Sequence, residues 1–148
     1  MNLLSRRSRL AVAAVVDVAL HARPQPVAAK ALANRHNLPP RHLETLLQAL
    51  VKANILKGVR GPRGGYELAR ERRRITAADI VRAAMSDGLD EEFVAESKLV
   101  REIVTPMVDR AGETFLAALD AVTVDDLCRE ASDREAFQLA KDDVDFTI

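Results

Sequence analysis

The sequence predicts a mainly α-helical protein, in which a winged helix-turn-helix domain precedes a long helix. Three observations predict this fold. Residues 1–86 contain three helical segments, a two-stranded hairpin and a further helix, in the order of a winged helix-turn-helix. Lysine and arginine concentrate in the same residues. Apolar residues then recur at helical spacing over residues 98–121.

Charge divides the 148-residue chain into two parts, although the formal net charge is zero. Residues 1–86 hold 16 lysines and arginines against 5 acidic residues, a net charge of +11. Residues 87–148 hold 6 against 17, a net charge of −11. A basic half indicates a polyanionic partner, and the acidic half is typical of a solvated oligomerisation or regulatory segment.

The first helix is expected over residues 5–22, with Ser5 as its N-cap and with apolar residues at helical spacing. The twin arginines before this apolar run imitate an export signal, but Asp17 interrupts the run, so we expect a core helix instead. No stretch reaches membrane-spanning length. The one cysteine, Cys128, cannot form an internal disulfide, which fits a reducing, cytoplasmic location.

Two more helices are expected over residues 27–37 and 40–54. Asn37 is a plausible terminator of the first, and Pro40 suits the first turn of the second. The third helix has a predicted buried stripe made of Leu43, Leu46 or Leu47, Leu50 and Val51. Its predicted exposed face carries Arg41, His42, Glu44, Thr45 and Gln48.

A β-hairpin follows, because residues 55–60 and 65–69 both alternate apolar and polar side chains around the glycine-rich segment between them. The basic run 70–74 is expected to be solvated. A helix over residues 75–85 opens with Thr76, and Asp79 completes a capping-box pattern.

The second half begins with an acidic segment, 86–97, expected to be a loop with a short helix. The helix over 98–121 could kink or restart at Thr105-Pro106. Its apolar stripe is broader than one small domain needs, which indicates a partner helix from a second copy. The expected dimerisation residues are Leu99, Ile103, Met107, Val108, Ala111, Phe115 and Leu119.

Residues 123–131 open with another capping box, Thr123 to Asp126, and the remaining acidic tail is expected to be frayed. The predicted division is therefore a winged helix-turn-helix domain over 1–86, an acidic linker, dimerisation helix and short capping helix over 87–131, and a flexible tail over 132–148.

The hairpin tip has the composition of a DNA-contacting wing. Its glycines, Gly61 and Gly64 among them, permit a tight turn and a close approach to a duplex. Pro62 stiffens the turn, while Arg60 and Arg63 supply charge and donors for phosphates or minor-groove acceptors. The glycine spacing matches neither a P-loop nor a dinucleotide-binding motif.

The first turn of the third helix is the part that enters a major groove in this fold. Arg41 could donate to guanine, and Glu44 could accept from a cytosine amino group or be an ordinary exposed charge. His42 could stack on the wing or touch a phosphate. Arg7 and Arg9, at the start of the first helix, are candidate phosphate contacts, and Thr45 completes the expected DNA-binding set.

Three stretches carry a family resemblance: "RRSRLAVAAVVDVAL", "LPPRHLETLLQALVKANILKGVRGPRGGYELAR" and "ITAADIVRA". They resemble the Rrf-two family of dimeric winged-helix transcription regulators, of the IscR, NsrR and CymR type. The resemblance covers residues 3–86 well and 118–127 weakly. It implies a homodimer with crossed long helices that reads double-stranded DNA with the third helix and the wing. It also implies a role in base discrimination for Glu44 and places the seven charged candidates named above, from Arg7 to Arg63, near DNA.

The chain departs from the family pattern in two places. Many relatives have Ser and Tyr where this chain has Pro39-Pro40-Arg41-His42, which leaves room for a different preferred operator. Cluster-binding members place three cysteines between the wing domain and the long helix, whereas residues 87–104 contain none here. An iron–sulfur cluster needs about three or four soft ligands, so we expect no cluster. No metal-ligand spacing occurs elsewhere, and no other cofactor is expected.

The effector stays open: a small ligand at the dimer hinge, a protein partner on the acidic surface, or none. Cys128 could act as a redox switch, but a buried apolar role is favoured. No nucleophile motif or metal-ligand spacing indicates an enzyme. The predicted function is a sequence-specific transcriptional regulator, a repressor by preference, and the alternatives are a protein-interaction module and a nonspecific DNA-binding protein.

Overall fold

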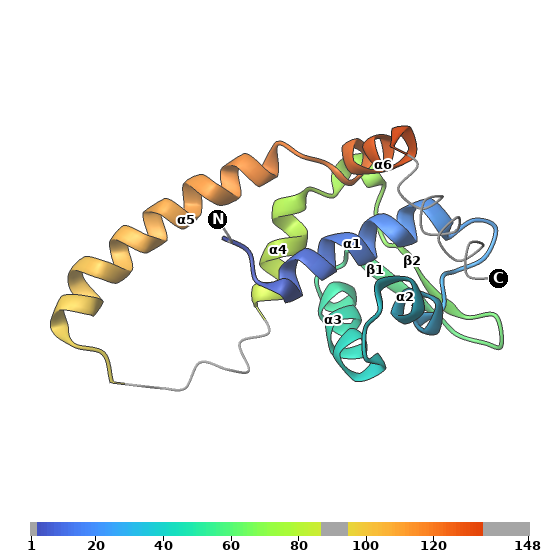
Figure 1. The fold of residues 1–148 in the computed structure, drawn as a ribbon, viewed down its shortest axis with the longest axis horizontal. Helices are drawn as coiled ribbons and strands as arrows, with labels where there is room; N and C mark the ends of the chain where they lie inside the picture. The colour runs from blue at the N-terminus through green and yellow to red at the C-terminus, as the bar shows by residue number, and fades with distance from the viewer. Residues whose placement is uncertain (1–2, 87–94, 135–148) are drawn as a thin grey trace, which may run out of the picture.

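The computed structural model describes residues 3–86 and 95–134. Figure 1 shows a helical domain with a two-stranded arm, and a long helix, α5, along one edge. The elements in chain order are α1 (Arg6–His21), α2 (Ala29–His36), α3 (Pro40–Lys52), β1 (Leu56–Val59), β2 (Gly65–Leu68), the 3₁₀ turn η1 (Arg72–Arg74), α4 (Ala77–Met85), the π-helical segment η2 (Val100–Val104), α5 (Thr105–Asp120) and α6 (Val124–Asp133). This order confirms the predicted winged helix-turn-helix.

Helix α1 is the centre of the core. It begins where predicted, because the Ser5 side chain accepts a hydrogen bond of 3.1 Å from the Ser8 backbone N–H. Its buried face includes Ala11, Val15 and Val18, and it packs against α2, α3, α4, β2 and α6. Most of the domain is therefore arranged around one helix, while α5 packs against α4.

Helix α2 starts two residues later than predicted. Val27 is not helical, because its N–H and C=O exchange hydrogen bonds of 2.9 and 2.8 Å with Tyr66 in the arm. The helix ends as predicted at Asn37, which adopts a left-handed conformation with φ of 52°. The arm is thus attached to the segment that precedes α2.

Helix α3 buries both Leu46 and Leu47 together with Leu43 and Leu50. The predicted burial of Val51 is wrong, since this side chain is 38% exposed. The core next to the end of α3 is filled instead by Ile55 and Leu56, which follow the turn after the helix.

Strands β1 and β2 form the predicted antiparallel hairpin. Leu56 pairs with Leu68 at its base, and Val59 pairs with Gly65 next to the loop. Leu56 is buried in the core, so the base of the hairpin is fixed while the loop projects from the domain (Figure 1).

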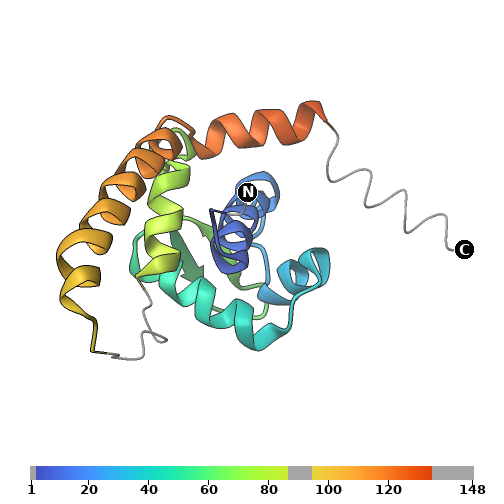
Figure 2. The same cartoon turned by 60° about the vertical axis from the view of Figure 1, so that its left-hand side comes forward.

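Helix α6 belongs physically to the core of the N-terminal domain. Both predicted capping boxes are present, at Thr76 for α4 and at Thr123 for α6. The two caps lie side by side, because Ala77 N–H donates to Val122 O and Val124 N–H donates to Ile75 O, both at 2.8 Å. Figure 2 shows α6 crossing above α1 from the end of α5.

The predicted long helix is divided near Thr105-Pro106, and the divider is the π-helical segment η2 directly before them. Pro106 has no N–H to donate to the preceding turn, so a wider turn at this position costs little. Figures 1 and 2 show α5 beside α4 at the edge of the molecule.

Three expectations concern the remaining segments. The basic run 70–74 is solvated as predicted, since residues 71–74 are all exposed, and within it Arg72 Nε lies 3.0 Å from Asp125 of α6. Helix α6 continues to Asp133, past the predicted start of the tail, while residues 135–148 and most of the acidic segment 86–97 lie outside the described residues. None of the helices in residues 3–86 and 95–134 combines the length and apolarity that a bilayer crossing requires.

Candidate nucleic-acid interface

Helix α3 presents a polar face opposite its buried leucines. Arg41, His42 and Glu44 are exposed in its first turns, as predicted, and Thr45 is half-buried. The Thr45 hydroxyl donates to the Arg41 carbonyl at 3.3 Å, so this hydroxyl is partly engaged within the helix. Gln48 is also exposed on the helix, one turn further from its start. These side chains offer guanidinium, imidazole, carboxylate and amide groups for contacts to base edges.

The wing loop, residues 60–64, carries two exposed arginines, Arg60 and Arg63, around Pro62. Gly61 has φ of +119°, a conformation that favours glycine, and its carbonyl accepts a hydrogen bond of 2.9 Å from Gly64 N–H. Figure 1 shows this loop projecting at the lower right and the α2–α3 turn at the lower edge. The wing loop and the first turn of α3 are therefore presented on one side of the molecule.

The structure supplies a second reason for the glycines of the wing. A Cβ on Gly64 would collide with the Val59 carbonyl, and a Cβ on Gly65 would collide with the Val27 carbonyl. These two positions are limited by close backbone packing within the arm, whereas only Gly61 requires glycine for its backbone angle.

Arg7 and Arg9 have different surroundings on α1. Arg9 is exposed, whereas the half-buried Arg7 donates from Nε to the Ala84 carbonyl at 3.3 Å. Arg7 thereby satisfies a carbonyl in the last turn of α4, which has no partner within that helix. Both arginines lie at the end of α1 remote from the wing in Figure 1, so any contact they make would fall on another part of the duplex.

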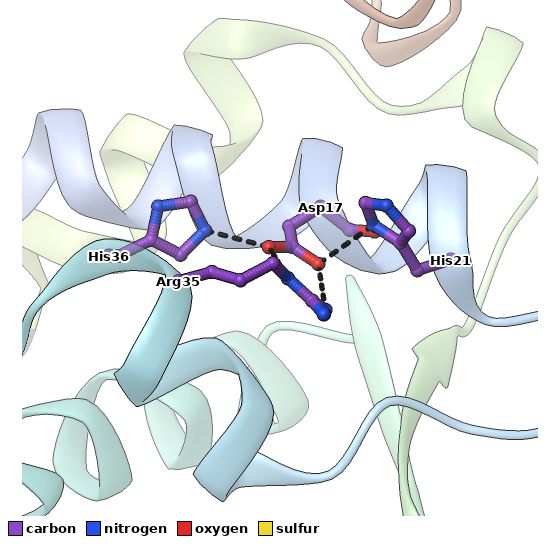
Figure 3. A network of polar contacts seen from close by, with 4 residues as sticks. All are labelled: Asp17, His21, Arg35 and His36. Carbon is purple, nitrogen blue, oxygen red and sulfur yellow. Dashed lines mark hydrogen bonds and ion pairs between the residues drawn. The ribbon is translucent and has the colours of Figure 1, made fainter. Parts of the chain in front are cut away.

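A buried polar network surrounds Asp17, and its partners were not predicted from the sequence (Figure 3). Asp17 is 0% exposed. Arg35 donates to its two oxygens at 2.6 and 2.8 Å, His36 Nε2 lies 2.8 Å away and His21 Nδ1 3.0 Å away. The sequence did contain one indication of such a network, namely an acidic residue on the apolar face of a helix. A buried charge requires a partner, so Asp17 had to meet cationic or hydrogen-bonding side chains in the fold.

The network fixes α2 against α1. Burial by itself would raise the pKa of Asp17, but hydrogen bonds from His36 and Arg35 and the charge of Arg35 lower it to about 2. The carboxylate is therefore ionised at neutral pH. Because Arg35 and His36 form the last turn of α2, this contact fixes the end of α2 and hence the start of the turn that leads into α3.

The expected dimerisation residues divide into two groups. Leu99, Ile103, Met107 and Val108 are 64%, 63%, 51% and 54% exposed, and Ala111 is exposed as well. Phe115 and Leu119 are half-buried, in the half of α5 that is joined to α6. The exposed group, together with Val104, is termed the apolar strip below. A run of exposed apolar side chains along an outer helix is typical of an interaction surface.

Comparison with known proteins identifies close relatives. The Rrf2 family model, described as an iron-dependent transcriptional regulator, matches residues 4–130. The HTH-type transcriptional regulator slr0846 of Synechocystis sp. is 35% identical over 138 residues, which are 91% of this chain and 93% of the relative. Among solved structures, IscR of T. potens has a TM-score of 0.66 at 31% identity, covering 86% of this chain and 87% of that one. CymR, the global cysteine regulator of B. subtilis, has a TM-score of 0.65 at 27% identity, covering 88% and 98%.

The residues present do not fit an iron–sulfur cluster. The sequence has one cysteine, fewer than the three or four soft ligands that a cluster requires. Cys128 is 2% exposed within the core, where burial raises the pKa of its thiol despite the opposing effect of Arg72. In residues 3–86 and 95–134, no three histidine, cysteine or acidic side chains gather in a metal-binding arrangement.

Proposed function

Because the chain belongs to the Rrf2 family of transcriptional regulators, we propose that this DNA-binding protein is a homodimeric repressor that reads a palindromic operator. Like its relatives, it is a transcriptional regulator and not an enzyme. The observation that carries the proposal is the presence of the first turn of α3 and the wing loop on one side of the molecule. An inserted helix and a flanking arginine arm are how winged helices bind a duplex.

In the proposed complex the two elements have different tasks. Arg41 and Glu44 lie where α3 would meet base edges, so they would set the preferred sequence. Arg60 and Arg63 would contact phosphates or the minor groove and contribute affinity that depends on salt. The net charge of +11 over residues 1–86 supports such a polyanionic partner.

The dimer is supported by the apolar strip of α5. A second copy placed around a two-fold axis would cover the strip and present two identical DNA-contacting surfaces. Two such surfaces require a palindromic site. Repression then needs only that the dimer occupies the DNA.

Selection of preferred duplexes from a random pool tests this function. We expect one palindromic motif to be enriched, with an affinity roughly 10³-fold or more above that for random DNA at physiological salt. Equal affinity for all sequences would favour a nonspecific DNA-binding protein. Absence of binding even at low salt would favour a protein-interaction module and contradict the proposal.

A further inference from the structure

A cleft of about 900 Å³ lies between the C-terminal end of α1, the base of the wing and the 3₁₀ turn η1. None of its lining residues belongs to α3 or to the wing loop, so it is separate from the candidate DNA interface. Ala19, Leu20 and Leu68 give it apolar wall area. Its size is that of many small-molecule sites.

The lining carries more positive than negative charge. It has two acidic residues, Glu67 and Glu71, and five cationic ones, which are Arg23, Lys57, Arg70, Arg72 and Arg73. Existing contacts occupy three of the cations: Lys57 lies 3.1 Å from Glu67, Arg72 lies 3.0 Å from Asp125, and Arg70 donates to the Asn54 carbonyl at 3.1 Å.

Two of the arginines have donors to spare. Within residues 3–86 and 95–134, Arg23 takes part in no hydrogen bond or ion pair. In the described part of the chain Arg73 reaches only Asp125, at 3.9 Å, and its side chain is 83% exposed. A guanidinium offers five N–H donors in a planar fork that matches carboxylate and phosphate groups. The cleft therefore combines apolar wall area with unused donors for anions.

We propose that this cleft binds a small organic anion with at least two carboxylate or phosphate groups. The charged groups would be held by Arg23 and Arg73, and the carbon skeleton would cover the apolar wall area near Leu20 and Leu68. A single inorganic ion would leave that apolar area unused. A DNA duplex is too wide to enter a concave site of this size, so the ligand is a small molecule.

The position of the cleft connects it to regulation, a consequence that rests on the proposed function. Arg72 joins the cleft to α6 through Asp125, and Lys57 and Glu67 belong to the two strands of the wing. An anion that draws Arg72 away from Asp125 would loosen α6 from η1, and contacts to Lys57 would change the base of the wing. Either change gives the ligand a different affinity for the DNA-bound and free forms, which is the requirement for allosteric control.

The test measures binding of three probes to the full chain without DNA, at constant ionic strength. The probes are citrate, inorganic pyrophosphate and fructose 1,6-bisphosphate, which separate carboxylate from phosphate recognition. We expect at least one to bind with one site per chain in calorimetry and to raise the melting temperature by roughly 3–8 °C at saturation.

Variants locate the bound anion. The double variant Arg23→Gln with Arg73→Gln removes the charges of two exposed side chains, and it should weaken binding of the anion at least tenfold. The matched pair Lys98→Gln with Arg134→Gln removes two charges outside the cleft and should leave binding unchanged, as should Arg60→Ala with Arg63→Ala.

Three results would overturn the proposal: no saturable binding of any probe, equal weakening by the cleft pair and the matched pair, or loss of binding only in the wing pair. Because these measurements contain no DNA, they stay informative if operator selection fails. Failure of the cleft and failure of the proposed function are therefore distinguishable.

Discussion

Asp17 shows how one buried carboxylate can position the turn between α2 and α3. Its oxygens are shared by side chains from α1 and from the last turn of α2, at distances of 2.6–3.0 Å. Replacing the carboxylate by an amide leaves Arg35 and His36 with one acceptor oxygen fewer and no opposing charge. Buried partners left in this way cost more free energy than the pair itself contributed.

We therefore expect Asp17→Asn to lower the free energy of unfolding by about 2–3 kcal/mol at pH 7. The pKa of Asp17 is lowered from 3.8 to about 2, so the folded state binds its proton less readily than the unfolded state. The carboxylate therefore stabilises the fold fully above about pH 4, and this contribution is lost as the pH falls toward 2.

Urea denaturation at fixed protein concentration, repeated from pH 7 to pH 3, checks this prediction. The difference between wild type and Asp17→Asn should shrink as the pH falls below about 4, where the carboxylate begins to be protonated. Asp133→Asn, an exposed position at the end of α6, is the control and should change little. A difference that grows as the pH falls from about 4 to about 3 would contradict the account of Asp17.

Glu44 tests base reading at a single side chain. Its carboxylate is exposed on α3, so its removal should leave the fold unchanged. Glu44→Ala should relax the base preference at one position in each half-site, by about 1–3 kcal/mol of discrimination. Site selection with the variant measures this directly. An unchanged selection profile would make Glu44 an ordinary surface charge.

Some residues of the candidate site could be predicted from the sequence, and others could not. Arg41, His42 and Glu44 could be predicted as exposed, because helical periodicity places them opposite the leucines. The partners of Asp17 could not, because Arg35 lies 18 positions away and no local pattern relates the two. Val51 was misplaced because residues beyond α3 fill the core next to it.

Among the elements, the wing depends on close backbone contacts rather than on side-chain burial. Gly65 lies against the backbone of Val27, where a bridge of two hydrogen bonds attaches the arm to the domain. Gly58 belongs to the facing strand, and a Cβ there would meet no atom within 4 Å. The two glycines therefore form a matched pair for substitution.

Gly65→Ala should destabilise the protein by about 1–3 kcal/mol, because its methyl group forces the arm away from Val27. Gly58→Ala should be close to neutral. Chemical denaturation and affinity for the selected operator measure the two effects, and we expect only Gly65→Ala to weaken binding. Equal behaviour of the two variants would show that the bridge does not position the wing.

Elements defined by local chemistry could be predicted, and those defined by distant contacts could not. The two capping boxes depend on residues three positions apart, so Thr76 and Thr123 marked both helix starts. The bridge at Val27 and the placement of α6 in the N-terminal core depend on segments far apart in sequence. The position of Pro106 indicated an irregularity in the long helix but not that it is π-helical.

At the scale of the whole molecule, α5 is expected to join two copies. Met107→Asp places a charge in the apolar strip and should dissociate the dimer at micromolar concentrations, because a charge without a partner is costly to bury. Ala117→Asp, at an exposed residue of α5 that is not part of the apolar strip, should not. Sedimentation equilibrium distinguishes the two, with circular dichroism to confirm folding. A dimer unaffected by Met107→Asp would require another interface.

The salt dependence of operator binding tests the central claim most directly, namely that the arginines of the wing loop hold DNA beside an inserted α3. The affinity of wild type should fall steeply with salt. The relevant quantity is the slope of the logarithm of the binding constant against the logarithm of the salt concentration. For Arg60→Ala with Arg63→Ala this slope should be shallower by about one for each phosphate that the variant no longer neutralises. Lys98→Gln with Arg134→Gln should keep the wild-type slope. A wing variant that also keeps the wild-type slope and affinity would contradict the account.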